Sequence, residues 1–266
     1  MSKLHIVALG SSFAAGPGLQ PIAHKDAKRS SVNYAQLLAN SLGAHLQDLT
    51  VSGATLLNIL RDPQVAGSTT FPPQISQIPA DADAVTLTAG GNDARYIGTM
   101  MRQAAASTSY IGGLLSVLLN YIMPTPSEAP PTDEELTSRF VESIDAIHQA
   151  APKARILLVT YLTCIGDDIR PGVNTQLSEE QIEAARKVAG RLRQCYIRAS
   201  EQRAGRCELV DVSEESKAHG IGSKEQWVCG FSVDMLWKGV APFHPTKQGM
   251  EYVAERLREV VQNGQR

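Results

Sequence analysis

The chain has 266 residues, 43% hydrophobic and 20% charged, which is ordinary for a globular protein and enough for one large core. Lys and Arg (25) nearly balance Asp and Glu (27), the formal net charge is −2, and no long basic run occurs. Nucleic acid is therefore not an expected partner.

The first apolar run, residues 6–9, is too short for a signal-peptide core and leads directly into a Gly/Ser turn. We expect a cytoplasmic protein, or a secreted one if a leader has been removed. The four cysteines lack metal-ligand spacing and are expected to be thiols, and neither a metal nor another cofactor is expected. The apolar stretch 104–123 holds too many Ser, Thr, Gly and Asn residues for a membrane span.

Strand-like runs and helical segments alternate along the chain. The expected strands cover residues 4–9, 45–51, 84–88, 155–160 and 208–212. Such alternation predicts one α/β domain over residues 1–266, with a parallel sheet between helices and the functional residues beyond the carboxyl ends of the strands.

Local signals place the helices between these strands. The apolar spacing from Tyr34 to Leu42 predicts a helix that ends at Gly43. The capping-box pairs Thr132–Glu135 and Ser178–Gln181 mark two further helix starts, and a last helix is expected from about Thr246.

Residues 95–131 interrupt the alternation, because they contain no strand candidate and end in a proline cluster. They are expected to form an insertion or a lid beside the site. A helix over residues 111–122, packed on the core, is a compatible interpretation.

Three strand-ending turns and one late histidine carry the residue types that acyl transfer needs. Ser12 follows the first strand, Gly53 the second and Asn92 the third, while His244 precedes the last helix. A serine hydroxyl becomes a nucleophile when a histidine removes its proton. The resulting oxyanion needs fixed donors, which the N–H groups of Ser12 and Gly53 and the side-chain amide of Asn92 could supply.

In this order, the four blocks resemble the SGNH (GDSL-type) hydrolases, in particular their lipase-like branch. The resemblance extends over almost the whole chain and includes the Phe71-Pro72-Pro73-Gln74 stretch. It implies a three-layer, flavodoxin-like α/β/α fold. It also implies that Ser12 is the nucleophile, that His244 is the base, and that Ser12, Gly53 and Asn92 form the oxyanion hole.

Two positions depart from the family pattern. Ser11 replaces the aspartate that precedes the nucleophile, and Ala241 replaces the aspartate three residues before the base. The acid that orients the imidazole is therefore absent from its usual place. The backbone carbonyl near Ala241 is the preferred substitute, and Asp234 from the preceding loop is the other.

These residues predict a serine carboxylic ester hydrolase acting on a small-molecule ester. An acyltransferase using the same site is one alternative, because an alcohol would simply replace water. A non-catalytic binding module that retains the fold is the other, suggested by Ser11 and Ala241.

Overall fold

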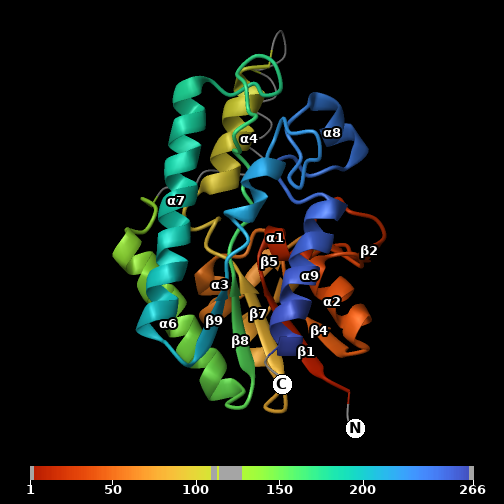
Figure 1. Ribbon diagram of the computed structural model, residues 1–266, viewed down its shortest axis with the longest axis vertical. Helices are drawn as coiled ribbons and strands as arrows, with labels where there is room; N and C mark the ends of the chain where they lie inside the picture. Colours follow the sequence, from red (N-terminus) through yellow and green to blue (C-terminus); the bar gives the residue numbers. More distant parts are fainter. Residues whose placement is uncertain (1–2, 109–112, 114–127, 264–266) are drawn as a thin grey trace.

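The computed structural model describes residues 3–108, 113 and 128–263. At its centre lies a parallel sheet of five strands in the order β4-β1-β7-β8-β9 (Figure 1). The strands are β1 (His5–Gly10), β4 (His45–Asp48), β7 (Ala84–Thr88), β8 (Arg155–Val159) and β9 (Cys207–Val210). The predicted parallel α/β architecture is confirmed.

The strand β4 is shorter than expected. The assigned strand ends at Asp48, although the N–H groups of Leu49 and Val51 still donate to the Ala8 and Gly10 carbonyls of β1 at 2.9 and 3.1 Å. The Asp48 carboxylate accepts hydrogen bonds from the Thr50 N–H at 3.0 Å and the Thr50 hydroxyl at 2.6 Å, and this local turn starts the loop that leads to Gly53.

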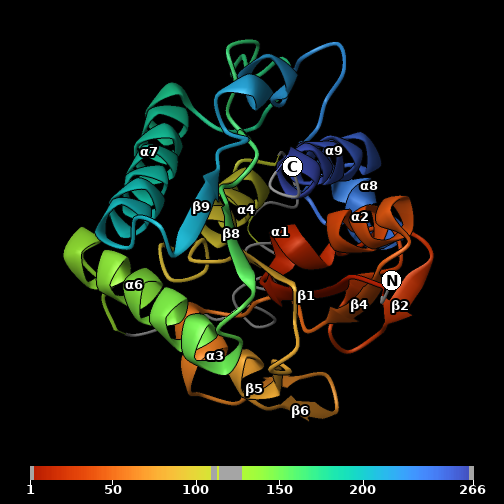
Figure 2. The same ribbon diagram turned by 60° about the horizontal axis from the view of Figure 1, so that its bottom comes forward.

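Helices cover both faces of the sheet and complete the three layers. In Figure 2, α2 and α9 lie on one side of the sheet, and α3, α6 and α7 lie on the other. The bounds of these helices are α2 (Tyr34–Leu42), α3 (Leu56–Leu60), α6 (Asp133–Ala150), α7 (Glu179–Gln202) and α9 (Lys247–Asn263).

The helix ends follow the local sequence signals. Both predicted capping boxes are present, and at the start of α6 the Thr132 hydroxyl accepts from the Glu135 N–H at 3.2 Å. The helix α2 ends at Gly43, which adopts the expected left-handed conformation with φ 61°. A third capping box, Thr55 with Asn58 at the start of α3, was not predicted because asparagine stands where glutamate or glutamine is usual.

Several short elements also escaped prediction. They are α1 (Ser12–Ala15), the hairpin strands β2 (Ile22–His24) and β3 (Arg29–Ser30), the hairpin strands β5 (Gln64–Ala66) and β6 (Thr69–Phe71), the 3₁₀ helices η1 (Gln74–Gln77) and η2 (Glu215–His219), and α8 (Val233–Lys238). The expected insertion begins with the helix α4 (Tyr96–Ala106). The helix predicted over residues 111–122 lies outside the described residues, apart from residue 113.

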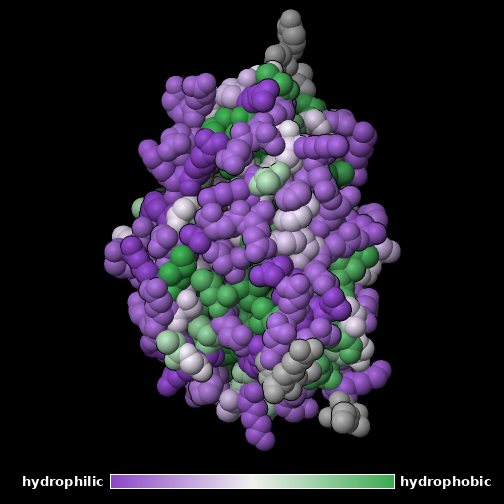
Figure 3. Space-filling model, in the orientation of Figure 1, coloured by the Kyte–Doolittle hydropathy of each residue, from purple (hydrophilic) through white to green (hydrophobic). Residues whose placement is uncertain are grey.

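The core runs along both faces of the sheet. In β1 the side chains from Ile6 to Leu9 are fully buried, and all five residues of β7 are buried, as expected for strands covered by helices on two sides. The face in Figure 3 is mostly hydrophilic, with a smaller hydrophobic patch in its lower part. All four cysteines are free in the structure. No helix in the described ranges is long and apolar enough to cross a membrane.

Candidate active site

The turn after β1 places Ser12 at the first position of a short helix. Gly10 closes the strand with φ 150°, and a Cβ there would lie 2.5 Å from the Thr88 carbonyl oxygen, so only glycine fits. Ser11 is extended and forms the N-cap of α1. Ser12 is 7% exposed. Its N–H belongs to the first turn of a helix, where N–H groups have no helical acceptor and can bind an anion.

A buried glutamine from the FPPQ stretch holds the same turn in place. The Gln74 side chain is 2% exposed and accepts from the Gly10 N–H at 2.8 Å while donating to the Gly10 carbonyl at 3.1 Å. The sequence flagged this stretch only by resemblance. Its physical role is to satisfy both backbone groups of the last residue of β1.

The second turn presents Gly53 after β4. The preceding residue is fixed on both sides, since the Ser52 N–H donates to the Ala27 carbonyl at 2.9 Å and the Ser52 carbonyl, which shares a peptide with the Gly53 N–H, accepts from Gln64 at 3.0 Å. The carbonyl and the N–H of one planar trans peptide point in opposite directions. Gln64 therefore orients the Gly53 N–H away from itself.

The third turn carries Asn92 between β7 and α4. One hydrogen of the Asn92 amide is donated to the Ala54 carbonyl at 2.8 Å. This bond fixes which end of the amide is nitrogen and leaves its second hydrogen as a donor. Asn92 is thus oriented by the residue that follows Gly53, which links the second and third turns.

Asp93 braces this turn from behind. Its carboxylate accepts from the Leu56 N–H at 2.9 Å and pairs with Arg139 at 2.9 Å, and its side chain is fully buried. Burial raises the pKa of Asp93, and the bonds from Leu56 and Arg139 oppose that rise. Both carboxylate oxygens are engaged, so Asp93 supports this turn and has no oxygen free for catalysis.

His244 lies just before α9 and is 8% exposed. Its Nδ1 atom lies 2.7 Å from the Pro242 carbonyl oxygen. A carbonyl oxygen only accepts, so Nδ1 carries the hydrogen and Nε2 keeps its lone pair. Burial lowers the pKa of His244 to about 4, Pro242 opposes this shift, and the nearby Lys28 charge adds to it.

A backbone carbonyl near Ala241 contacts the imidazole, as predicted, but it is the carbonyl of Pro242 and not that of Ala241 itself, and Asp234 is not the partner. The Ala241 carbonyl lies 3.2 Å from the Cys229 thiol, and the exposed Asp234 pairs with Lys238 at 2.7 Å. The carbonyl that meets the imidazole is that of Pro242 because Phe243 adopts a left-handed conformation with φ 58°. This conformation turns the chain back on itself.

Two backbone hydrogen bonds join the histidine segment to Cys229, and one ring contact places it beside the nucleophile turn. The Phe243 N–H donates to the Cys229 carbonyl at 3.1 Å, and the Cys229 N–H donates to the His244 carbonyl at 3.0 Å. The imidazole ring centroid lies 5.6 Å from that of Phe13, the residue after Ser12. The ends of the chain that bear Ser12 and His244 therefore meet.

A separate pocket of about 390 Å³ opens beside α7. Its walls include Tyr161, Leu192 and Arg193, but neither Ser12 nor His244. It is therefore not the place where these two residues would meet a substrate.

The fold thus places Ser12, Asn92 and His244 near the carboxyl-terminal edge of the sheet, where parallel α/β proteins bind their ligands. The model of the GDSL-like Lipase/Acylhydrolase family matches residues 8–252, and the chain belongs to this family. It is a serine ester hydrolase of the lipase or esterase type.

Known relatives agree with this assignment. Lipase 2 of Streptomyces coelicolor is 26% identical over 278 residues, which cover 97% of this chain and 86% of the relative. Lipase 1 of the same organism is 25% identical over 253 residues, which cover 91% and 81%.

Two crystal structures share the fold. The extracellular lipase of Streptomyces rimosus has a TM-score of 0.68 at 20% identity, with 98% of this chain and 99% of that chain covered. Phospholipase A1 of Streptomyces albidoflavus has a TM-score of 0.71 at 20% identity, with 97% and 99% covered.

Proposed function

We propose that the protein hydrolyses carboxylic esters through an acyl-enzyme on Ser12, with His244 as general base. The observation that carries this proposal is the 2.7 Å contact between His244 Nδ1 and the Pro242 carbonyl. It supports the tautomer in which Nε2 accepts a proton. A backbone carbonyl thus takes over the orienting part of the role that a carboxylate has in a triad.

In the first half-reaction, Nε2 of His244 takes the hydroxyl proton of Ser12 as Oγ attacks the ester carbon. The carbonyl oxygen becomes an oxyanion, which accepts hydrogen bonds from the Ser12 N–H, the Gly53 N–H and the free amide hydrogen of Asn92. When the intermediate collapses, the alcohol leaves and takes the proton back from the imidazolium.

In the second half-reaction, water replaces the alcohol. Nε2 removes one water proton, the hydroxide attacks the acyl carbon, and collapse returns that proton to Ser12 Oγ and releases the acid. The protein groups end in their starting protonation states, so no cofactor is needed for the balance.

The names of the relatives support an acyl ester as the substrate. Two sequence relatives are lipases, and one protein of the same fold is a phospholipase A1. The relative from S. rimosus is extracellular, whereas the cytoplasmic location expected from this sequence stays a prediction.

Turnover of a p-nitrophenyl ester tests the proposal. Ser12→Ala is expected to lower kcat by about 10⁴-fold or more, as loss of a triad member does. Ser41→Ala on the exposed surface of α2 is the control and is expected to keep the wild-type rate. A Ser12→Ala enzyme with an unchanged rate would refute the proposal.

A further inference from the structure

A chain of three hydrogen-bonded groups joins the turn after β1 to the turn after β7. The Ser11 hydroxyl lies 3.0 Å from the Tyr161 hydroxyl, and the Gly91 N–H donates to the same Tyr161 oxygen at 3.1 Å. Ser11 precedes the nucleophile, and Gly91 precedes the oxyanion-hole asparagine. One phenol oxygen therefore touches the direct neighbours of both residues.

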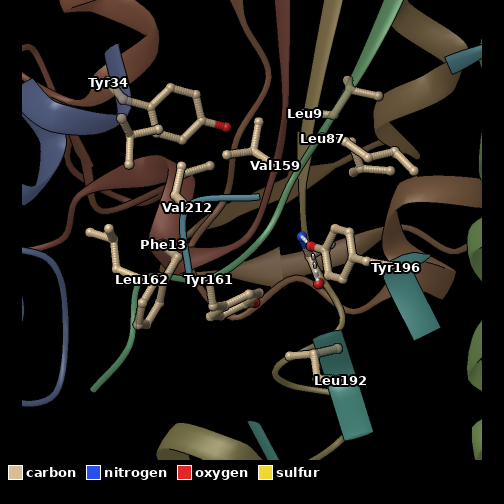
Figure 4. Close-up of a cluster of buried hydrophobic side chains, with 14 of the residues drawn as sticks. Leu9, Phe13, Tyr34, Leu87, Val159, Tyr161, Leu162, Leu192, Tyr196 and Val212 are labelled. Carbon is tan, nitrogen blue, oxygen red and sulfur yellow. Dashed lines mark hydrogen bonds between the residues drawn. The ribbon is translucent and has the colours of Figure 1, made fainter. Parts of the chain in front are cut away.

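The sheet order explains how Tyr161 reaches both turns. Tyr161 lies just after β8, and β7 separates β8 from β1. Neighbouring strands are about 4.8 Å apart, so a tyrosine at the end of β8 can span the end of β7 and meet the turn after β1. The ring lies against that of Phe13, with centroids 4.4 Å apart (Figure 4).

The bridge is buried and closely fitted. Ser11 is 0% exposed and Tyr161 is 8% exposed. A Cβ on Gly91 would lie 2.7 Å from the Tyr161 oxygen, so a glycine is required for this approach. Burial raises the pKa of Tyr161 to about 12, which keeps the phenol neutral. A neutral phenol can accept from the Gly91 N–H and share a hydrogen bond with Ser11 at the same time.

We propose that Tyr161 is a positioning residue that sets the nucleophile turn against the oxyanion turn through Ser11 and Gly91. This role rests on the proposed function. It also gives a reason for the departure from the family pattern at position 11. An aspartate in this buried place would set a carboxylate beside the phenol, whereas the serine forms a neutral pair with it.

Catalysis is sensitive to the relative placement of these two turns. A displacement near 1 Å can cost on the order of 100-fold in rate. Tyr161→Phe keeps the ring against Phe13 but removes the shared oxygen, so the two turns lose their common partner. We expect kcat to fall about 10- to 100-fold while KM changes less than about threefold, because the oxyanion forms only in the transition state.

The experiment compares Tyr161→Phe, Ser11→Ala and their double variant on the p-nitrophenyl ester. The inhibition constant of phenylboronic acid, which forms a tetrahedral adduct on an active serine, is measured alongside, as is the urea midpoint. If Tyr161 and Ser11 act through one shared bond, the kcat of the double variant should lie within about twofold of that of the slower single variant. Boronate affinity should fall by the same factor as kcat.

Tyr34→Phe is the matched control. Tyr34 is also buried, and its hydroxyl lies 3.0 Å from the Thr88 hydroxyl, but it bonds to neither turn. This variant is expected to lower the urea midpoint and to leave kcat and boronate affinity at their wild-type values.

Equal kcat and boronate affinity in wild type and Tyr161→Phe would overturn the positioning role, and so would equal losses in Tyr161→Phe and Tyr34→Phe. If Tyr161→Phe does not fold, Ser11→Ala alone decides between the same outcomes. None of these outcomes affects the proposed function, provided that the wild-type enzyme hydrolyses the ester and the Ser12→Ala enzyme does not. A wild-type enzyme without turnover would instead refute the proposed function.

Discussion

Because His244 is buried beside a carbonyl and not beside a carboxylate, the pH dependence of kcat/KM can be predicted. The base must be unprotonated to act, so kcat/KM falls on the acid side as His244 gains a proton in the free enzyme. With a pKa of about 4, the acid limb should lie well below that of an ordinary histidine at 6.5. At pH 5.5 the enzyme should still have roughly 97% of its maximal kcat/KM.

Returning an aspartate to position 241 tests whether a carboxylate beside the imidazole opposes this shift, which burial causes. A carboxylate within about 4–6 Å of an imidazolium raises its pKa by roughly 1–3 units. The acid limb of Ala241→Asp is therefore expected at about pH 5–7. Ala241→Asn has nearly the same shape without the charge and should keep the limb near that of the wild type.

The assay is kcat/KM for a neutral ester from pH 3.5 to 8, with far-ultraviolet circular dichroism at each pH to verify that the protein stays folded. A wild-type limb near pH 6.5 would refute the argument from burial. Identical limbs in the Asp and Asn variants would refute the argument from the missing carboxylate.

Three further predictions concern stability and are measured by urea denaturation. The pKa of folded His244 lies below its unfolded value of 6.5, so the unfolded chain binds the proton first as the pH falls. The stability that neutral His244 contributes is therefore present above pH 6.5 and is lost as the pH falls toward 4. Relative to His244→Gln, wild type should be about 2 kcal/mol less stable at pH 4.5 than at pH 7. A constant difference between the two proteins would contradict this. Gln74→Leu should cost about 1–3 kcal/mol because the Gly10 N–H loses its partner, and a cost near zero would show that another group satisfies it. Arg139→Met should cost about 3 kcal/mol by leaving Asp93 charged and unpaired, and adding Asp93→Asn should recover part of that loss; a double variant weaker than the single one would contradict this explanation.

The sequence was sufficient for the elements whose cause is local. The strand of residues 84–88 was predicted with its observed bounds, because a short run of β-formers with Val85 and Leu87 is stopped by the glycines that follow it. The helix from Tyr34 to Leu42 was also predicted in full, since Gly43 marks its end. The hairpin of residues 64–71 was missed although its two-residue Gly67-Ser68 turn is a hairpin signal, because strands of three residues show too little alternation to be recognised.

The partners that orient the site could not be predicted in the same way. Pro242 meets the imidazole only because of the left-handed backbone of Phe243, and a bulky residue gives no sequence signal for that conformation. Gln74 and Tyr161 act on the turn after β1 from 64 and 150 residues away. Their roles follow from the order of strands in the sheet, which a single sequence does not specify.

The central claim, that Ser12 is a nucleophile activated by His244, is tested most directly with a fluorophosphonate probe on the folded protein. Peptide mass mapping should find one probe per chain, attached to Ser12, and His244→Ala should slow the labelling by several orders of magnitude. Attachment to a different serine, or labelling of Ser12 at the same rate without His244, would contradict the account.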